Sequence, residues 1–240
     1  MSKPLPKFVL FTDLDGTMLD AATYSYEKAL PLIELLKRNS IPIVFCSHKT
    51  RAEQEVYRQE LGISDPFIVE NGGAIFIPQG YFSFSFDCDR GLGEYQVIEL
   101  GMPYAEIRRV LEQIRVDARL DFKGFGDMSA REVAEETGLD LEAARRAKAR
   151  EYDETLKLEG TPEEIDRVLS AVKEAGLNYT SGGRYYDVTG PNDKGEATKI
   201  LADLFRKKLG PVETVGTVSY THLRAHETSL HLVCRLLLEK

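Results

Sequence analysis

The sequence is poor in several features that mark particular classes of protein. Its 240 residues include only three cysteines, Cys46, Cys88 and Cys234, and none of them belongs to a CxxC pair. An odd, widely spaced set argues against a disulfide framework and a zinc site, and it favours a reducing compartment. The N-terminus MSKPLPKFVLF lacks the apolar segment of a signal peptide, and no run approaches the roughly 18 apolar residues of a membrane span. We therefore expect a cytoplasmic protein without a membrane partner.

Positive charge is scarce as well. The chain has 31 Lys and Arg residues against 39 Asp and Glu residues, which gives a formal net charge of -8. Because nucleic-acid binding needs a surplus of Lys and Arg on one face, this balance disfavours a nucleic-acid partner, and any anionic ligand must be bound locally. The sequence has neither internal repeats nor low-complexity segments, and its 42% of apolar residues suffice for one large core or two smaller ones. The sequence leaves the oligomeric state open.

Alternating strand and helix patterns organise the first part of the chain. Apolar runs predict buried strands over residues 8–12, 41–46 and 67–69, and helical spacing predicts a helix over residues 26–38. Thr50 and Glu53 have the spacing of a capping box, so a second helix is expected to begin there. Strand, helix and strand in succession indicate an α/β fold with a doubly wound, Rossmann-like parallel sheet.

The pattern changes near Tyr95 and returns near Asp193, which predicts an inserted domain. Between these points we expect a mixed α+β domain over residues 91–188, and capping signals at Ser129 and Thr161 predict the starts of two of its helices. Asp193 is expected to cap a helix that leads into a strand over residues 212–216. The first part of the core would then comprise residues 1–90, and its second part residues 189–216.

Four polar residues follow predicted strands or begin a helix of the core. Asp13 and Asp15 end the first strand in the motif DLDGT, Ser47 follows the second strand, and Lys194 lies in the first turn of the later helix. Two neighbouring carboxylates can divide the roles of nucleophile and proton carrier, while a hydroxyl and a lysine can hold a phosphoryl group. An ordinary Asp-Gly turn is the alternative for DLDGT; a calcium loop is excluded because its later oxygen ligands would be misplaced.

The order of these residues resembles the haloacid dehalogenase superfamily of phosphatases with an α+β cap of type IIB between the second and third motifs. Within that superfamily, the stretches FTDLDGT, SHKTR, PFIVENGGAIFIP, GFGDMSAREVAEETGL, SGGRYYDVTG and DKGEA resemble the mannosyl-3-phosphoglycerate phosphatases. The resemblance implies a Mg²⁺-dependent hydrolysis of mannosyl-3-phosphoglycerate, a step in compatible-solute biosynthesis. Asp13 would be the nucleophile that forms an aspartyl-phosphate and Asp15 the acid and base. Ser47 and Lys194 would hold the phosphoryl oxygens.

The same resemblance implies a Mg²⁺ site made by the Asp13 carboxylate and the Asp15 backbone carbonyl, with a further acidic ligand in a loop after Gly216. The acidic loop is absent from this sequence. Substrate contacts are expected in the cap and beside the core motifs. Arg150 and Arg184 suit the phosphate and carboxylate of a sugar phosphoglycerate, Glu70 and Asn71 suit sugar hydroxyls, and Lys49 adjoins Ser47. Each has a plain alternative, namely solvated cap arginines, a hairpin turn at Asn71, and a helix start for Lys49 and its neighbour His48.

Two other functions compete with this one. A phospho-receiver signalling domain also combines acidic residues, a hydroxyl and a lysine at strand ends, but it is compact, whereas a long insert separates Ser47 from Lys194 here. A related phosphatase of the same superfamily acting on another sugar phosphate, such as sucrose phosphate or a hexose phosphate, differs only in its substrate. Only the resemblance of the cap stretches to the mannosyl-3-phosphoglycerate phosphatases argues against this second alternative.

The segment over residues 217–240 differs in composition from the rest of the chain. It holds three of the four histidines, His222, His226 and His231. From Thr217 on it resembles the translation of a sequencing-library adapter, so we expect a non-native tail and a truncated second part of the core, and we expect weakened Mg²⁺ binding and poor folding. The alternative is an amphipathic terminal helix that uses Leu230, Val233, Leu236 and Leu237.

Overall fold

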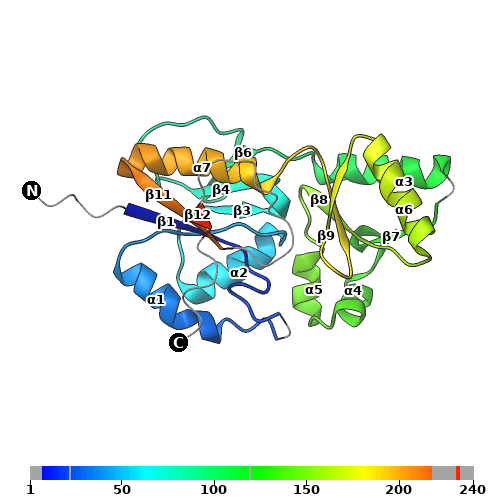
Figure 1. Ribbon diagram of the computed structural model, residues 1–240, viewed down its shortest axis with the longest axis horizontal. Coiled ribbons are helices and arrows are strands. Elements are labelled where there is room, and N and C mark those ends of the chain that lie inside the picture. The colour runs from blue at the N-terminus through cyan, green and yellow to red at the C-terminus, as the bar shows by residue number, and fades with distance from the viewer. Residues whose placement is uncertain (1–6, 22, 119, 218–230, 233–240) are drawn as a thin grey trace, which may run out of the picture.

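The chain forms two domains that lie side by side (Figure 1). The computed structural model describes residues 7–21, 23–118, 120–217 and 231–232, and the structural statements below concern these residues. The core domain carries both ends of the described chain, and the inserted cap domain is joined to it by two crossings of the backbone (Figure 1). Within the described residues, no helix is long and apolar enough to cross a membrane.

Parallel strands form the central part of the core. The sheet order is β12-β11-β1-β2, with every pair parallel, and a parallel bridge between Cys46 and Ile68 places β3 beside β2. Beyond β3 the strands continue in the antiparallel order β3-β4-β6-β5. The strands are β1 (Lys7–Thr12), β2 (Ile43–Phe45), β3 (Phe67–Val69), β4 (Ala74–Pro78), β5 (Arg90–Leu92), β6 (Tyr95–Glu99), β11 (Val212–Thr217) and β12 (His231–Leu232).

Helices cover both faces of this sheet, as the predicted α/β fold requires. The short 3-10 helix η1 (Glu27–Ala29), α1 (Leu30–Arg38) and α2 (Arg51–Leu61) lie on one face, and α7 (Lys194–Leu209) lies on the other (Figure 1). Successive side chains of a strand point to opposite faces. Leu10 of β1 accordingly joins the apolar cluster with Ile33 of α1, whereas Val9 joins the cluster with Phe205 of α7.

The cap is an antiparallel sheet with one apolar and one polar face. Its order is β7-β8-β10-β9. Leu156 and Val188 face helices α3 and α6 in a buried apolar cluster. Because side chains alternate along a strand, Asp153 and Asp187 occupy the opposite face. The elements are α3 (Tyr104–Asp117), β7 (Lys123–Gly124), η3 (Phe125–Asp127), α4 (Ala130–Thr137), α5 (Leu141–Ala147), β8 (Asp153–Lys157), α6 (Pro162–Glu174), β9 (Asn178–Ser181) and β10 (Tyr186–Thr189).

Local capping signals locate the helix starts well. Thr50, Ser129 and Thr161 each form a complete capping box, and Asp193 caps α7 by accepting a hydrogen bond from the Glu196 amide. The predicted helix starts are confirmed. The sequence could predict them because each bond joins residues only three positions apart.

The boundary between core and cap differs from the expected one. The sequence pattern predicts an inserted domain over residues 91–188, whereas β5 and β6 pair with β4 and extend the core sheet as far as Glu99. An antiparallel excursion of this kind has no helix between its strands, so the chain loses its alternating pattern before it leaves the core. The expected non-native segment over residues 217–240 lies outside the described residues except for Thr217, which ends β11, and β12.

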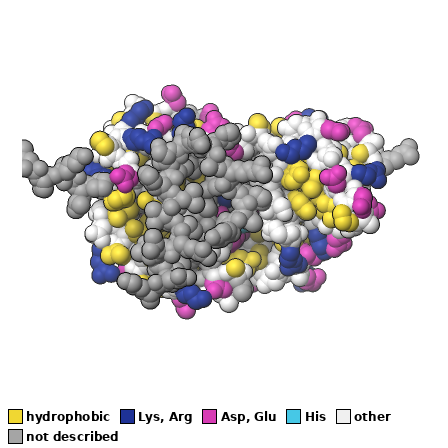
Figure 2. All heavy atoms as spheres, in the orientation of Figure 1, with side chains coloured by type: hydrophobic (Ala, Val, Ile, Leu, Met, Phe, Trp, Pro, Cys, Tyr) yellow, Lys and Arg dark blue, Asp and Glu magenta, His cyan; other side chains and the backbone are white. Residues whose placement is uncertain are grey.

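Charges of both signs are interspersed over the described surface in the view of Figure 2.

Candidate active site

The loop after β1 holds two carboxylates at the carboxyl end of the sheet. Asp13 stays attached to the sheet because its amide donates to the Thr217 carbonyl at 2.9 Å. Its Oδ1 accepts a hydrogen bond from the Leu14 amide at 2.8 Å. Gly16, with φ of 68°, then turns the chain, and residue 15 forms an isolated bridge with Leu19. The positive φ is a conformation that glycine adopts without a steric penalty.

Lys194 reaches Asp13 from α7, the helix that covers one face of the core sheet. It is the first residue of α7, and its Nζ lies 3.3 Å from Asp13 Oδ2. Gly72 allows the start of α7 to approach this closely. A Cβ on Gly72 would lie 2.3 Å from the Asp193 carbonyl oxygen, and its φ of 88° also favours glycine.

Ser47 follows β2 and is fully buried. Its amide donates to the Ile68 carbonyl at 3.2 Å, and its hydroxyl oxygen accepts a hydrogen bond from the Lys49 amide at 3.3 Å. The Asn71 amide in turn donates to the Ser47 carbonyl at 3.2 Å. Ser47 therefore lies in a hydrogen-bonded loop at the same sheet edge as Asp13.

Two basic side chains from this loop contact Asp15. His48 Nε2 and Lys49 Nζ each lie 3.1 Å from Asp15 Oδ2. Burial raises the pKa of Asp15, but the hydrogen bond and the charge of His48, and then those of Lys49, hold it below its usual value. Burial lowers the pKa of His48, but the hydrogen bond to Asp15 and the charge of Asp187 raise it overall. Asp15 is therefore ionised in this arrangement.

Asp15 retains capacity for a further partner. Its Oδ1 is buried and has no hydrogen-bond partner among the described residues. A buried carboxylate oxygen without a partner is costly, and such groups concentrate at functional sites.

The donor set suits a hard cation of the Mg²⁺ type. Mg²⁺ is usually held by one or two carboxylates together with water and substrate phosphates, and Asp13 supplies a carboxylate at a strand end. The described residues contain no group of three or more His, Cys, Asp or Glu side chains placed to hold a metal. The position after Gly216 is occupied by Thr217, whose hydroxyl bonds Thr12 Oγ1 at 2.8 Å.

Glu70 lies at the junction of core and cap, where its bonds are to the backbone. It is fully buried and accepts hydrogen bonds from the amides of Glu151, Tyr152 and Asp153 at 2.6 to 3.0 Å. Burial raises the pKa of Glu70 to about 7, although the charge of Arg150 opposes this. The side chain thus fastens the start of the cap strand β8 to the core.

Arg150 links the cap to the loop that follows β2. Its Nη1 donates to the His48 carbonyl at 2.9 Å and to Asp153 Oδ1 at 2.8 Å, and its Nε donates to the Ala147 carbonyl at 2.9 Å. Thr50 Oγ1 adds a bond to the Arg146 carbonyl at 2.9 Å. The loop that bears His48 and Lys49 is therefore held from the cap side.

Arg184 is set apart from this group. Its side chain is 68% exposed and binds the carboxylate and the backbone carbonyl of Glu136 within the cap.

The structure brings together Asp13, Asp15, Ser47, Lys49 and Lys194, and it places Glu70, Asn71 and Arg150 at the neighbouring junction.

The sequence did not indicate two carboxylates of the polar cap face. Asn71 Nδ2 lies 3.4 Å from both Asp153 Oδ2 and Asp187 Oδ2, and Thr155 Oγ1 donates to Asp187 Oδ1 at 2.9 Å. The available signal was the alternation of polar and apolar residues in the stretches DETLK and YDVT. That alternation identifies a polar face but not what the face lies against.

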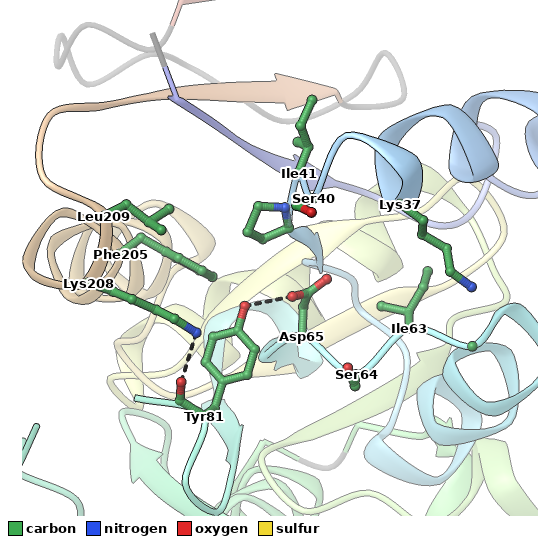
Figure 3. A pocket seen from close by; sticks show the side chains of 12 residues that line it. Lys37, Ser40, Ile41, Ile63, Ser64, Asp65, Tyr81, Phe205, Lys208 and Leu209 are labelled. Atoms are coloured by element: carbon green, nitrogen blue, oxygen red, sulfur yellow. Dashed lines mark hydrogen bonds between the residues drawn. The ribbon is translucent and has the colours of Figure 1, made fainter. Parts of the chain in front are cut away.

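A separate pocket of about 370 Å³ opens at the other end of the core sheet (Figure 3). It is lined by residues that precede β2 and β3, together with Lys37 of α1, Tyr81 and the end of α7. Tyr81 donates to Asp65 at 2.6 Å, and Lys208 donates to the Tyr81 carbonyl at 2.8 Å (Figure 3). The pocket therefore lies at the amino ends of the strands, away from Asp13.

Comparisons with known proteins identify the family of this chain. Residues 10–85 match the haloacid dehalogenase-like hydrolase family. A glucosyl-3-phosphoglycerate/mannosyl-3-phosphoglycerate phosphatase of Methanococcoides burtonii is 48% identical over 210 residues, which cover 88% of this chain and 77% of that protein. A mannosyl-3-phosphoglycerate phosphatase of Pyrococcus furiosus is 42% identical over 202 residues, covering 83% and 78% of the two chains.

The chain belongs to this family of haloacid dehalogenase-type phosphatases. Members of the family are phosphoric monoester hydrolases, and the predicted superfamily and enzyme class are confirmed. The fold agrees as well. A solved sugar phosphatase of haloacid dehalogenase subclass IIB matches with a TM-score of 0.57 at 16% identity, over 88% of this chain and 80% of that one.

Proposed function

We propose that the protein hydrolyses mannosyl-3-phosphoglycerate, or its glucosyl counterpart, to the glycosylglycerate and phosphate in a Mg²⁺-dependent reaction in the cytoplasm. The contact between Asp13 and Lys194 carries the proposal, because it pairs a nucleophilic carboxylate with a cation at the carboxyl end of the sheet. The substrates follow from the names of relatives 48% and 42% identical to this chain. Both described cysteines, Cys46 and Cys88, are free, which suits a reducing compartment.

In the first half of the reaction, an oxygen of Asp13 attacks phosphorus. A bond forms between this oxygen and phosphorus, and the bond from phosphorus to the glycerate oxygen breaks. Asp15 donates a proton to the departing oxygen, and Lys194 and the loop at Ser47 hold the phosphoryl oxygens. The Asp13 carboxylate and the Asp15 backbone carbonyl would hold Mg²⁺, which would supply positive charge to offset the phosphate charge.

In the second half, water attacks the aspartyl-phosphate. Asp15 accepts a proton from the water, phosphate leaves, and Asp13 is restored as a carboxylate. The contacts of Asp15 with His48 and Lys49 favour its ionised form and so suit this base step. The acid step requires a protonated Asp15, so its ion pairs must be exchanged when substrate binds.

The proposal is tested by phosphate release in the presence and absence of Mg²⁺. The panel comprises mannosyl-3-phosphoglycerate, glucosyl-3-phosphoglycerate, sucrose 6-phosphate and mannose 6-phosphate. We expect turnover of the two phosphoglycerates to exceed that of the other two at least about tenfold in kcat/KM, and to be lost with Asp13→Asn. Equal turnover of mannose 6-phosphate would overturn the named substrate and leave a sugar phosphatase of broader range.

A further inference from the structure

Lys49 is a buried cation placed beside the proton-carrying carboxylate. The residue is only 7% exposed, and its Nζ lies 3.1 Å from Asp15 Oδ2 and 3.6 Å from Glu53 Oε1. Lysine is rarely buried unless it is paired, and an ammonium group carries three donors. The Lys49 ammonium group can therefore donate to a further partner. The side chain of His48, which is 36% exposed, contacts the same Asp15 carboxylate. Two basic side chains therefore lie next to the position of the leaving oxygen.

The proposed substrates place a second anion close to that position. In a glycosyl 3-phosphoglycerate, the carboxyl carbon is two carbon-carbon bonds from the carbon that bears the phosphate oxygen. With bonds of about 1.5 Å, the carboxylate oxygens lie within roughly 5 Å of the leaving oxygen. Asp15 must contact the leaving oxygen to protonate it. A cation in contact with Asp15 is therefore within reach of the carboxylate.

We propose that Lys49, with His48 beside it, binds the glycerate carboxylate and thereby selects phosphoglycerate esters over phosphate esters that lack a carboxyl group. The inference rests on the proposed function and assigns the recognition of one part of its substrate. Specificity then resides in the acid common to the mannosyl and glucosyl substrates, and the hexose contributes less to it.

The arginines that suit a carboxylate by chemistry have other partners. Arg150 is bonded to the His48 carbonyl, to Asp153 and to the Ala147 carbonyl, and Arg184 binds Glu136 on an exposed part of the cap. The polar cap face that meets the core presents Asp153 and Asp187, which would repel a substrate carboxylate. Lys194 pairs with Asp13. Among the described residues near Asp15, the basic side chains of Lys49 and His48 therefore remain for this anion.

The test uses a pair of substrates that differ only in the carboxyl group. Mannosyl-3-phosphoglycerate is compared with the analogue in which the carboxylate is reduced to a primary alcohol. Loss of the contact between Lys49 and Asp15 affects both substrates, so Lys49→Gln should lower kcat/KM for both. The loss for the acid should exceed the loss for the alcohol about 10- to 100-fold, as expected for the additional loss of a charge-assisted hydrogen bond. Lys49→Arg should restore part of the preference. Lys208→Gln, which alters a lysine in the amino-end pocket, should leave both values unchanged.

An equal loss on both substrates would overturn the inference and make Lys49 a positioning residue for Asp15. A binding measurement separates this result from failure of the proposed function. With the Asp13→Asn variant, calorimetry should show 3-phosphoglycerate binding at least about tenfold more tightly than glycerol 3-phosphate, and the additional change Lys49→Gln should remove that difference. Equal affinity of the two ligands before this additional change would reject the carboxylate site, whatever substrate is turned over.

Discussion

The two ends of the core sheet differ in how their polar groups are used. At the carboxyl end, Asp13, Asp15 and Lys194 converge, and a buried oxygen of Asp15 has no hydrogen-bond partner in the described part of the chain. At the amino end, the pocket of Figure 3 has a volume of about 370 Å³. Its Asp65, however, already accepts hydrogen bonds from the Ile43 amide and the Tyr81 hydroxyl.

This difference shows that the end of the sheet with the pocket of Figure 3 is not the end at which the unsatisfied polar groups gather. The amino-end groups are already bonded to one another: Lys208 donates to the Tyr81 carbonyl and lies over the Tyr81 ring at 3.7 Å from its centroid. The carboxyl-end groups keep charge and hydrogen-bonding capacity for a ligand. Since parallel α/β sheets place ligands beyond the carboxyl ends of their strands, the topology and the unsatisfied groups identify the same end.

The largest expected effect comes from making the same substitution, Asp to Asn, at each end of the sheet. Asp13→Asn should reduce kcat at least about 10³-fold, because an amide does not replace a carboxylate nucleophile. Asp65→Asn at the amino end should leave kcat within about twofold and instead lower the free energy of unfolding by about 1 to 2 kcal/mol. Phosphate release and urea unfolding measure the two quantities. Comparable losses of kcat in both variants would break the comparison.

A steric change at the carboxyl end should have the next largest effect. Gly72→Ala places a methyl group against the backbone of Asp193, which must shift α7 and move Lys194 relative to Asp13. We expect a loss of about 10- to 100-fold in kcat and a destabilisation of about 1 to 3 kcal/mol.

Gly80→Ala is the matched control for this change. Gly80 also has a positive φ of 72°, but a Cβ there meets nothing within 4 Å. It should show only the backbone strain of about 1 to 2 kcal/mol, with unchanged kcat. If both variants lost activity alike, strain rather than the contact with α7 would explain the effect.

Sequence patterns predicted the features that depend on local or topological rules. The capping boxes at Thr50 and Ser129 involve neighbours in the chain, so they fixed two helix starts. The carboxyl ends of parallel strands share one edge, so Asp13 and Ser47 were expected on the same side of the sheet, and the structure places them there.

The remaining features depend on partners that are distant in the sequence. Glu70 and Arg150 were expected to contact substrate, and the structure bonds both of them to the junction between cap and core. A buried charged side chain binds whatever tertiary packing places against it, which periodicity does not reveal. The contacts of His48 and Lys49 with Asp15 arise in the same way, from two loops that meet only in the folded sheet.

Titration of Glu70, at the junction of core and cap, should have a moderate effect on the free energy of unfolding. The pKa of Glu70 is raised by burial to about 7, so the folded state binds this proton more tightly than the unfolded state does. The resulting contribution to stability is fully present below the ordinary glutamate pKa and is lost as the pH rises through about 7. We expect the stability difference between wild type and Glu70→Gln to shrink by on the order of 2 kcal/mol from pH 4.5 to pH 8. Urea unfolding across this range measures it, and parallel pH profiles would contradict the assignment.

The smallest expected effect sharpens the comparison from the amino end. Tyr81→Phe removes the hydroxyl that donates to Asp65 at 2.6 Å and leaves the ring against Phe205 and Lys208. Asp65 keeps its bond from the Ile43 amide at 2.8 Å, so the variant should lose only about 1 kcal/mol of stability, with kcat and KM unchanged. Thermal unfolding and steady-state kinetics on the same preparation check both values. A change in KM without a change in stability would mean that the amino-end pocket communicates with substrate, and the two ends of the sheet would no longer be functionally distinct.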